Sequence, residues 1–364
     1  MASWRERIIR WHERVAIRES RGVGASVARA ALGAAAGGFG LAVRLRDALY
    51  RLRILPSSRP TVPVISVGNL TLGGAGKTPM VEWLAARCAR AGRRVAILSR
   101  GYGAIDDEAL DDRADLGGVV RLTGANRARL ALEAVGDYGA QILILDDGFQ
   151  HRRLQRDLEV VLVDATRPFG NGRLFPRGTL REPPSALRRA GLIVLTRTDQ
   201  VTPEALNALR ATLRGIAGET PTVETVHRPA DIKLPGGSER RDLSWLRGRE
   251  VLAFCGIGNP EAFRRTLESL GARTVCFRAF PDHHPYTEAD RARLKAEAKE
   301  FMAEALVTTE KDLRRIRWTD PEPPLCAVRI RLEPVRHGEA LDRLLDGLLK
   351  TTAAAPATME GAPR

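Results

Sequence analysis

The sequence is poor in aromatic residues and in grouped cysteines. Aromatic side chains make up 5% of the 364 residues, so the chain lacks the stacking surfaces that proteins use to hold single-stranded nucleic acid. Its four cysteines stand far apart, without CxxC pairs or the ligand spacing of a zinc site. We expect them to be small buried side chains in a reducing compartment, and therefore expect a cytoplasmic protein.

We also expect no cleavable signal peptide, because arginines between Arg5 and Arg21 precede any apolar stretch. Positive charge is plentiful instead. The net charge is +14, and residues 1–53 carry half of it, with eleven arginines, no lysine and four acids. Such an excess favours phosphate-rich partners: nucleic acid, nucleotides or an anionic membrane.

The first residues also show an amphipathic pattern. Apolar side chains recur there at helical spacing, at Trp4, Ile8, Trp11 and Val15. The pattern is typical of a helix lying in a membrane interface, and equally of a helix packed on its own domain; the two tryptophans among arginines favour the membrane. The following stretch, residues 22–43, is rich in Ala and Gly and contains Arg29, which predicts a poor membrane-spanning helix.

A glycine-rich loop follows the apolar run Val64–Val67 and precedes a helical pattern from Met80. A strand, such a loop and a helix form the context of a P-loop, in which backbone N–H groups surround phosphates. Lys77 is placed to reach the β- and γ-phosphates of ATP, and the Thr78 hydroxyl to bind Mg²⁺. The remaining loop positions expected to contact nucleotide are Thr71, Gly73, Gly74, Ala75 and Gly76; the standard pattern has glycine where this chain has Thr71.

Two carboxylates end another apolar run, Ile142–Leu145. Asp146 and Asp147 follow it directly. Alone, Asp-Asp-Gly after a strand is commonly a turn. Beside a P-loop, an acidic strand end is typical of the side chains that hold the Mg²⁺ of the nucleotide.

Apolar runs alternate with helix-length segments along most of the chain, which predicts an α/β fold of the P-loop NTPase type: a mostly parallel sheet with helices on both faces. The pattern weakens between residues 215 and 249 and then resumes. We therefore expect an N-terminal basic amphipathic region (1–55), a P-loop core (56–217), a second smaller α/β domain (218–350) and a disordered tail (351–364).

Six motifs, in order, resemble the tetraacyldisaccharide 4′-kinase family, the lipid A kinases. The resemblance covers residues 62–315. It rests on Val67–Pro79, Ser99–Gly103, Asp146–His151, Phe169–Gly172 with Leu180–Pro183, Asp282-His283 and Thr309–Asp312. It implies ATP-dependent phosphorylation of the 4′-hydroxyl of tetraacyldisaccharide 1-phosphate, with Mg²⁺, by a peripheral or monotopic enzyme on the cytoplasmic face of the inner membrane. Nucleic acid and an obligate protein partner are not expected.

The resemblance also implies catalytic roles. Lys77 acts on the phosphates, and Asp107 aligns with the base that accepts the sugar hydroxyl proton. The register is open between Asp106, Asp107 and Glu108, because two residues of the family's Gly-Asp-Glu-Pro motif differ here. His283 aligns with a histidine that partners the base. From the residues alone, the acidic run 106–112 is also typical of a solvated loop.

The remaining implied roles concern nucleotide and metal. By the resemblance, Arg127 and Arg181 face phosphates, and Tyr102 lies near the nucleotide or the sugar. Glu182 lies near the metal, which Thr78, Asp146 and Asp147 hold.

Two other functions compete with a kinase. Thr196-Arg-Thr-Asp199 follows an apolar run where a P-loop GTPase places its guanine-reading motif, although Arg197 replaces the usual lysine. Leu72 stands where dimeric switch ATPases place a signature lysine, and no switch segment is visible. A basic nucleic-acid-binding ATPase is the other alternative, against which the low aromatic content counts.

Overall fold

A computed structural model gives the fold of residues 22–100, 118–235, 239–282, 284–316, 318 and 321–353. The strands are β1 (Val64–Asn69), β2 (Val95–Ser99), β3 (Val119–Thr123), β4 (Ile142–Asp146), β5 (Leu158–Asp164), β6 (Leu192–Thr196), β7 (Thr222–Lys233), β8 (Arg240–Arg241), β9 (Glu250–Cys255), β10 (Arg273–Ala279), β11 (Ala305–Thr309) and β12 (Leu325–Arg336). The α-helices are α2 (Val23–Arg51), α3 (Lys77–Arg90), α4 (Arg127–Gly136), α5 (Pro203–Ala217), α6 (Pro260–Ser269), α7 (Glu288–Glu300), α8 (Glu310–Ile316) and α9 (Gly338–Ala353).

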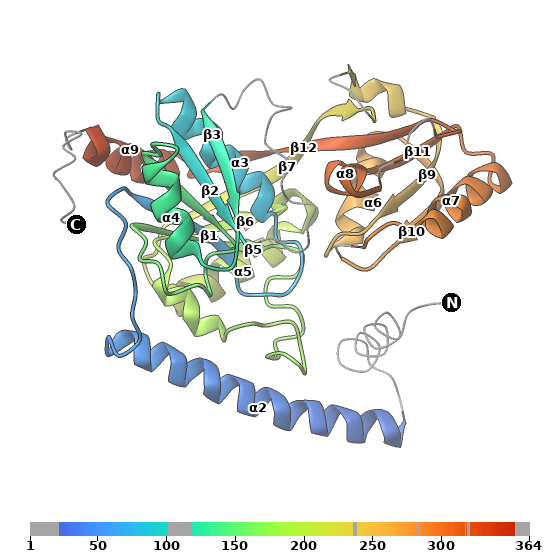
Figure 1. Ribbon diagram of the computed structural model, residues 1–364. Helices are drawn as coiled ribbons and strands as arrows, with labels where there is room; N and C mark the ends of the chain where they lie inside the picture. The colour runs from blue at the N-terminus through green and yellow to red at the C-terminus, as the bar shows by residue number, and fades with distance from the viewer. Residues whose placement is uncertain are drawn as a thin grey trace.

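One twisted sheet runs through the protein in the order β10-β9-β11-β12-β7-β6-β5-β1-β4-β2-β3, with β8 beside β7. Its pairings are parallel except β7 with β12 and β7 with β8. Two parallel blocks thus lie on either side of an antiparallel pair (Figure 1). The predicted mostly parallel α/β sheet is confirmed.

Helices cover both faces of each block. On one face of the β1 block, α3 and α9 pack through Met80, Leu84 and Leu345; α5 and α4 cover the other face. In the second block, α6 packs on one face and α7 and α8 on the other. The central parallel strands β1, β2, β5 and β6 are buried along their whole length, which explains why the sequence shows continuous apolar runs there instead of alternation.

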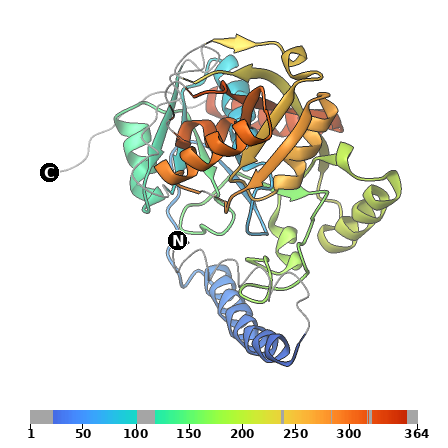
Figure 2. The same ribbon diagram turned by 90° about the vertical axis from the view of Figure 1, so that its right-hand side faces the viewer.

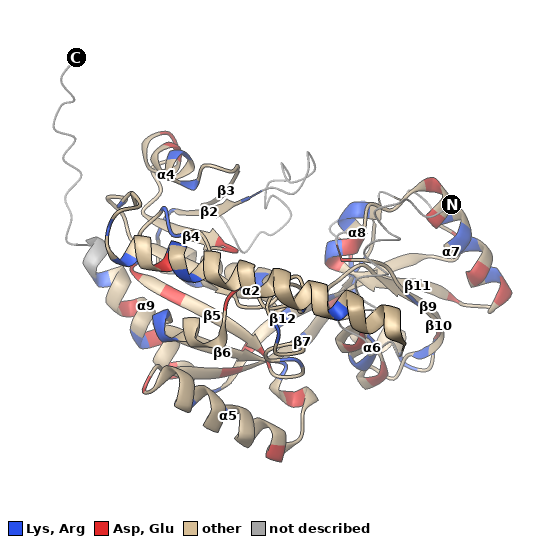
Figure 3. Cartoon of the chain, turned by 90° about the horizontal axis from the view of Figure 1, so that it is seen from below, with Lys and Arg blue, Asp and Glu red and all other residues tan. Residues whose placement is uncertain are grey.

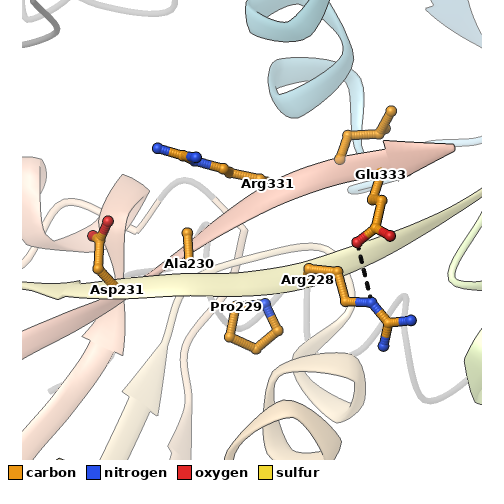
Figure 4. Close-up of a pocket in the computed structure, with 7 residues that line it drawn as sticks. Arg228, Pro229, Ala230, Asp231, Arg331 and Glu333 are labelled. Atoms are coloured by element: carbon orange, nitrogen blue, oxygen red, sulfur yellow. Dashed lines mark hydrogen bonds and ion pairs between the residues drawn. The ribbon is translucent and has the colours of Figure 1, made fainter. Parts of the chain in front are cut away.

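The long strands β7 and β12 connect the two blocks (Figure 1). β7 lies within residues 215–249, where the sequence pattern is weak, and the pattern did not predict this strand. Its Pro229 is tolerated because the ladder shifts register at this point, opposite Arg329 and Ile330. Figure 4 shows the surface hollow on this connection, where Arg228 of β7 pairs with Glu333 of β12 at 3.3 Å.

Helix α9 returns to the first block after β12. Leu341, Leu345 and Leu349 join the core beneath α3, and Arg87 of α3 pairs with Asp346 at 3.1 Å. Although α9 falls within the range expected for the second domain, it therefore packs on the P-loop core. The helix continues to Ala353. The domain boundaries themselves stay a prediction.

Helix α2 extends along the underside of the first block and past it (Figures 1 and 2). Its C-terminal half is attached: the rings of Phe39 and Phe175 lie 5.9 Å apart, and Asp47 pairs with Arg152 and Arg189, each at 3.3 Å. Its other faces carry exposed Val23, Val27, Leu41 and Leu45.

Figure 3 shows that α2 is nearly free of charged side chains over most of its length. Within the described residues it is the one helix long and apolar enough to span a membrane by length and composition, with a mean hydropathy of 1.4 over its most apolar window. The sequence pattern predicted a poor spanning segment, because residues 22–43 are rich in Ala and Gly and contain Arg29, whereas the helix Val23–Arg51 has the length and hydropathy of a span. Residues 1–21, with Trp4 and Trp11, lie outside the described part.

Candidate active site

The glycine loop connects β1, which is buried throughout, to the N-terminus of α3. Gly73 and Gly76 have φ angles of 108° and 91°, which side chains other than glycine rarely adopt. The first N–H groups of α3 have no acceptor within their own helix, and the helix dipole adds partial positive charge at this end. The loop therefore offers the backbone donors that phosphate oxygens require.

Lys77, the first residue of α3, points back over the loop. Its Nζ donates to Asn69 Oδ1 at 3.0 Å and lies 3.5 Å from Asp147 Oδ1. Asn69, the last residue of β1, is a site residue whose importance the sequence pattern did not indicate. Its Nδ2 also donates to Thr71, to the backbone oxygen at 2.8 Å and to Oγ1 at 3.2 Å.

Arg181 holds Asp147 opposite Lys77. Its guanidinium donates to both carboxylate oxygens of Asp147, each at 2.9 Å, and to the backbone oxygen of Asn69 at 3.1 Å. Burial acts to raise the pKa of Asp147, but the hydrogen bonds from Arg181 and the charge of Lys77 outweigh it and lower the pKa to about 2. Asp147 is therefore ionised at neutral pH, and its left-handed φ of 56° is fixed by these contacts.

Asp146 ends β4 beside Asp147 but has a different environment. Burial raises its pKa, while the charges of Arg121, whose Nη1 lies 3.8 Å away, and of Lys77 act in the opposite direction. Arg121 belongs to β3, which the sequence pattern did not predict. The two carboxylates are thus held near Lys77 by arginines from separate elements.

Glu182 takes a position that the sequence did not suggest. It is fully buried, and its carboxylate pairs with Arg46 of α2 at 2.9 Å and with Arg189 at 2.8 Å. Both oxygens therefore face arginines that tie α2 to the core. A role for Glu182 beside the metal stays a prediction.

Arg127 is the first residue of α4 and is buried. It lies close to His151: burial first, and then the charge of Arg127, lower the pKa of His151 to about 4, so this imidazole is neutral at pH 7. Both residues lie past the carboxyl ends of β-strands, where ligands bind in open α/β sheets. Tyr102, Asp107 and His283 lie outside the described residues, with Asp106 and Glu108.

The second block also faces this site. Lys311 pairs with Asp282 at 3.3 Å, and its charge opposes the rise that burial causes in the pKa of Asp146. Asp312 is fully buried and accepts from Thr309 Oγ1 at 2.6 Å and from the backbone N–H of Gly256 at 3.0 Å. The motif 309–312 thus forms the start of α8 and directs Lys311 toward the first block.

The donor set fits a magnesium–nucleotide complex. An ionised carboxylate (Asp147) and a second carboxylate (Asp146) lie at one end of the parallel strands, near the Lys77 ammonium, and Thr78 is the next residue of α3. Within the described ranges, no cluster of three or more His, Cys, Asp or Glu side chains is arranged to hold a metal. Mg²⁺ with few protein ligands needs phosphate oxygens to complete its shell, which is how P-loop proteins bind it.

The glycine loop, the lysine at its helix and the strand-end carboxylates define a P-loop nucleotide-binding protein. Comparison with known proteins narrows this class. A family model described as Tetraacyldisaccharide-1-P 4′-kinase (LpxK) matches residues 28–350. Two curated relatives named tetraacyldisaccharide 4′-kinase, from Anaeromyxobacter sp. (strain Fw109-5) and Anaeromyxobacter dehalogenans (strain 2CP-C), are 49% and 45% identical; each alignment covers 90% of this chain and 93% of the relative.

Among solved structures, the crystal structure of the "apo" form of LpxK from Aquifex aeolicus in complex with ATP is 29% identical, with a TM-score of 0.65 over 88% of this chain and 99% of that one. The chain belongs to the tetraacyldisaccharide 4′-kinase family and is an ATP-dependent kinase. The resemblance of the six motifs is confirmed, and the GTPase and nucleic-acid alternatives are set aside.

The low pKa of Asp147 predicts how stability changes with pH. A carboxylate whose folded pKa is depressed stabilises the fold fully above its unfolded pKa of about 3.8, and this stabilisation is lost as pH falls toward about 2. We expect the difference in unfolding free energy between wild type and Asp147→Asn to be constant from pH 8 to 5 and to shrink below pH 4. Chemical denaturation at each pH measures it.

Arg181→Met provides the comparison, because it removes the cation that lowers this pKa. In that background the folded pKa of Asp147 lies closer to its unfolded value, so the part of the difference that is lost between pH 5 and 2 should be smaller. A difference in the wild-type background that already shrinks between pH 7 and 5 would contradict the assignment.

Proposed function

We propose that this chain transfers the γ-phosphoryl group of ATP to the 4′-hydroxyl of tetraacyldisaccharide 1-phosphate at the site around Lys77. Family membership supports the reaction, and one observation supports the place: Lys77 lies between Asn69 and Asp147 over a glycine loop at the end of a buried strand. From this position the Lys77 ammonium can exchange its ion pair with Asp147 for one with the phosphates of ATP.

The residues around Lys77 have separate proposed roles in phosphoryl transfer. The loop 71–76 and the start of α3 hold the phosphates, and Lys77 stabilises negative charge on the transferred group. Thr78, Asp146 and Asp147 are the proposed metal side, with Glu182 near it. Mg²⁺, when bound, neutralises phosphate charge. Arg181 keeps the Asp147 carboxylate ionised and oriented, and Arg127 and Tyr102 face the phosphates and the nucleotide or sugar.

The sugar hydroxyl must lose a proton as it attacks. We propose that Asp107 accepts this proton, with His283 as its partner, because both align with positions of the family motifs. Asp282, the neighbour of His283, pairs with Lys311, whose charge reaches Asp146. This pairing supports a contribution of the second block to the site.

Lys77→Ala tests the site. Loss of the ammonium should lower kcat for transfer of labelled γ-phosphate from ATP to the disaccharide lipid by about 10²- to 10³-fold, because charge on the phosphates is no longer balanced. Lys295→Ala, at an exposed position of α7, is the matched control and should leave kcat unchanged. Near wild-type turnover of Lys77→Ala would remove the assignment.

Substitutions in the acidic loop test the base. Asp107→Ala should lower kcat by about 10²- to 10⁴-fold with little change in ATP binding, whereas Asp106→Ala should have a mild effect. Adding His283→Ala to Asp107→Ala should cost much less than the product of the two single losses, if the pair acts as a unit. A large loss of kcat in Asp106→Ala or Glu108→Ala, together with normal kcat in Asp107→Ala, would show that one of those two residues is the base instead.

We further propose that the N-terminal region places the enzyme on the cytoplasmic face of the inner membrane, where its lipid substrate and an anionic surface lie. α2 supports this proposal: its attached end carries the ion pairs of Arg46 and Asp47, while Val27, Leu41 and Leu45 are exposed. An exposed apolar row of this length on a basic segment is typical of membrane-associated helices.

The variant Val27→Asp with Leu41→Asp tests membrane docking. Each exposed apolar side chain that enters the interface contributes roughly 1.5–3 kcal/mol, so the pair should lower partitioning into anionic vesicles at least about tenfold. Turnover of detergent-dispersed substrate should persist. Leu132→Asp, at an exposed leucine of α4, is the matched control. Deleting residues 1–53 is less informative, because it also removes Arg46 and Asp47. Unchanged partitioning of the double variant would refute the docking role of α2.

A further inference from the structure

Arg197 has an unusual backbone and environment. It follows β6 with a left-handed φ of 57°, and its side chain is buried. A residue other than glycine keeps this conformation only where its surroundings fix it, and such residues concentrate at functional sites. Arg197 belongs to the segment Thr196–Asp199, which stands where a GTPase reads its base, yet its guanidinium lies under the P-loop.

Two neighbouring side chains hold two consecutive carbonyls of the phosphate loop. Arg197 Nη2 donates to the oxygen of Gly74 at 3.0 Å, and Thr196 Oγ1 donates to the oxygen of Ala75 at 3.0 Å. The C=O and N–H of one trans peptide point in opposite directions. Holding the Ala75 carbonyl therefore turns the Gly76 N–H toward the other side of the loop, where phosphate is expected.

Asp164, at the end of β5, connects Arg197 to the second block. Its Oδ2 pairs with Arg197 Nη1 and accepts from Asn259 Nδ2 at 3.1 Å, while its Oδ1 accepts from the Thr166 hydroxyl at 2.7 Å. Arg197, Asp164 and Asn259 are all at least nine-tenths buried, at 6%, 7% and 4% exposure. Water cannot replace a partner here, so losing one leaves a buried polar group unsatisfied.

Asn259 begins α6, and the residue before it touches the phosphate loop. Its Oδ1 accepts from the N–H of Ala262 at 3.2 Å and so caps the helix. A Cβ placed on Gly258 would lie 2.2 Å from the N atom of Gly74, so the two backbones are in direct contact. The start of α6 thus contacts the loop directly at Gly258 and indirectly through Asn259 and Asp164.

We propose that Asn259, Asp164 and Arg197 form a positioning relay through which the start of α6, in the second block, sets the shape of the phosphate loop. None of these side chains needs to touch ATP. The relay makes the affinity for ATP depend on the position of the second block, which also carries Asp282 and Lys311. It rests on the assignment of loop 71–76 as the ATP site.

Asn259→Ser is the discriminating variant. Serine is also a good helix cap, so α6 keeps its first turn. Its shorter side chain cannot reach Asp164, so the relay is broken while the cap remains. We expect kcat/KM for ATP to fall about 5- to 50-fold, the loss typical of an unsatisfied buried group, with KM for the lipid unchanged. The rise in Tm that MgATP produces should shrink in parallel.

Two further variants complete the test. Asn259→Asp should lose more ATP affinity than Asn259→Ser, because it places a second carboxylate against Asp164. Arg197→Lys should also weaken ATP binding, since one ammonium cannot replace a guanidinium that contacts both Asp164 and Gly74. Arg210→Lys is the matched control: Arg210 of α5 holds buried Glu224 at 2.7 Å, away from the loop, and its change should lower Tm alone.

The outcomes separate the relay from the site on which it depends. If Asn259→Ser lowers Tm like the Arg210→Lys control and binds ATP like wild type, the contacts are structural only and the relay is overturned. Wild-type ATP affinity in Arg197→Lys would overturn it as well. Failure of the wild-type enzyme to bind ATP would overturn the P-loop assignment and the relay together.

Discussion

The antiparallel ladder between β7 and β12 is the contact on which the rest of the architecture depends. Each strand contributes to both halves of the molecule: Val328 of β12 lies in the core of the second block, and Leu332 lies in the core beneath α3. The ladder also returns the chain to the first block, where α9 completes that core. Because the two blocks share one sheet, the loop before α6 can contact the phosphate loop at Gly258.

One buried and one half-buried carboxylate organise a cluster of arginines beside α2. Asp47 and Glu182 together engage Arg46, Arg152 and Arg189, and this network attaches α2 next to Arg181. Removing one partner from such a network leaves an uncompensated charge, which is far more costly than a surface pair. Part of the chain's positive charge therefore lies in ion pairs that attach α2 to the first block. The exposed apolar face of α2 and the ATP site are connected through adjacent residues, Arg181 and Glu182.

Local patterns in the sequence identified the phosphate loop, the carboxylates after β4 and most strands. These features depend on short-range rules: glycine where φ is positive, an apolar run for a strand buried on both faces, and a helix directly after the glycine loop. The pattern missed β7 because Pro229 and its neighbours look irregular, whereas a register shift in the ladder accommodates the proline. It likewise missed Asn69 as a partner of Lys77, since an asparagine at a strand end carries no periodic signal.

The sequence by itself determined which groups the proposed ATP site offers, because the loop, its lysine and the acidic strand end lie within local motifs whose geometry follows from backbone rules. Only the tertiary structure decided which partners those groups meet. Asp147 meets Arg181, Glu182 faces Arg46 of α2, and Arg197 lies beneath the loop with Asp164 and Asn259. These pairs are 33 to 136 residues apart in the chain. They form because strand order, and not sequence spacing, places the ends of distant elements together.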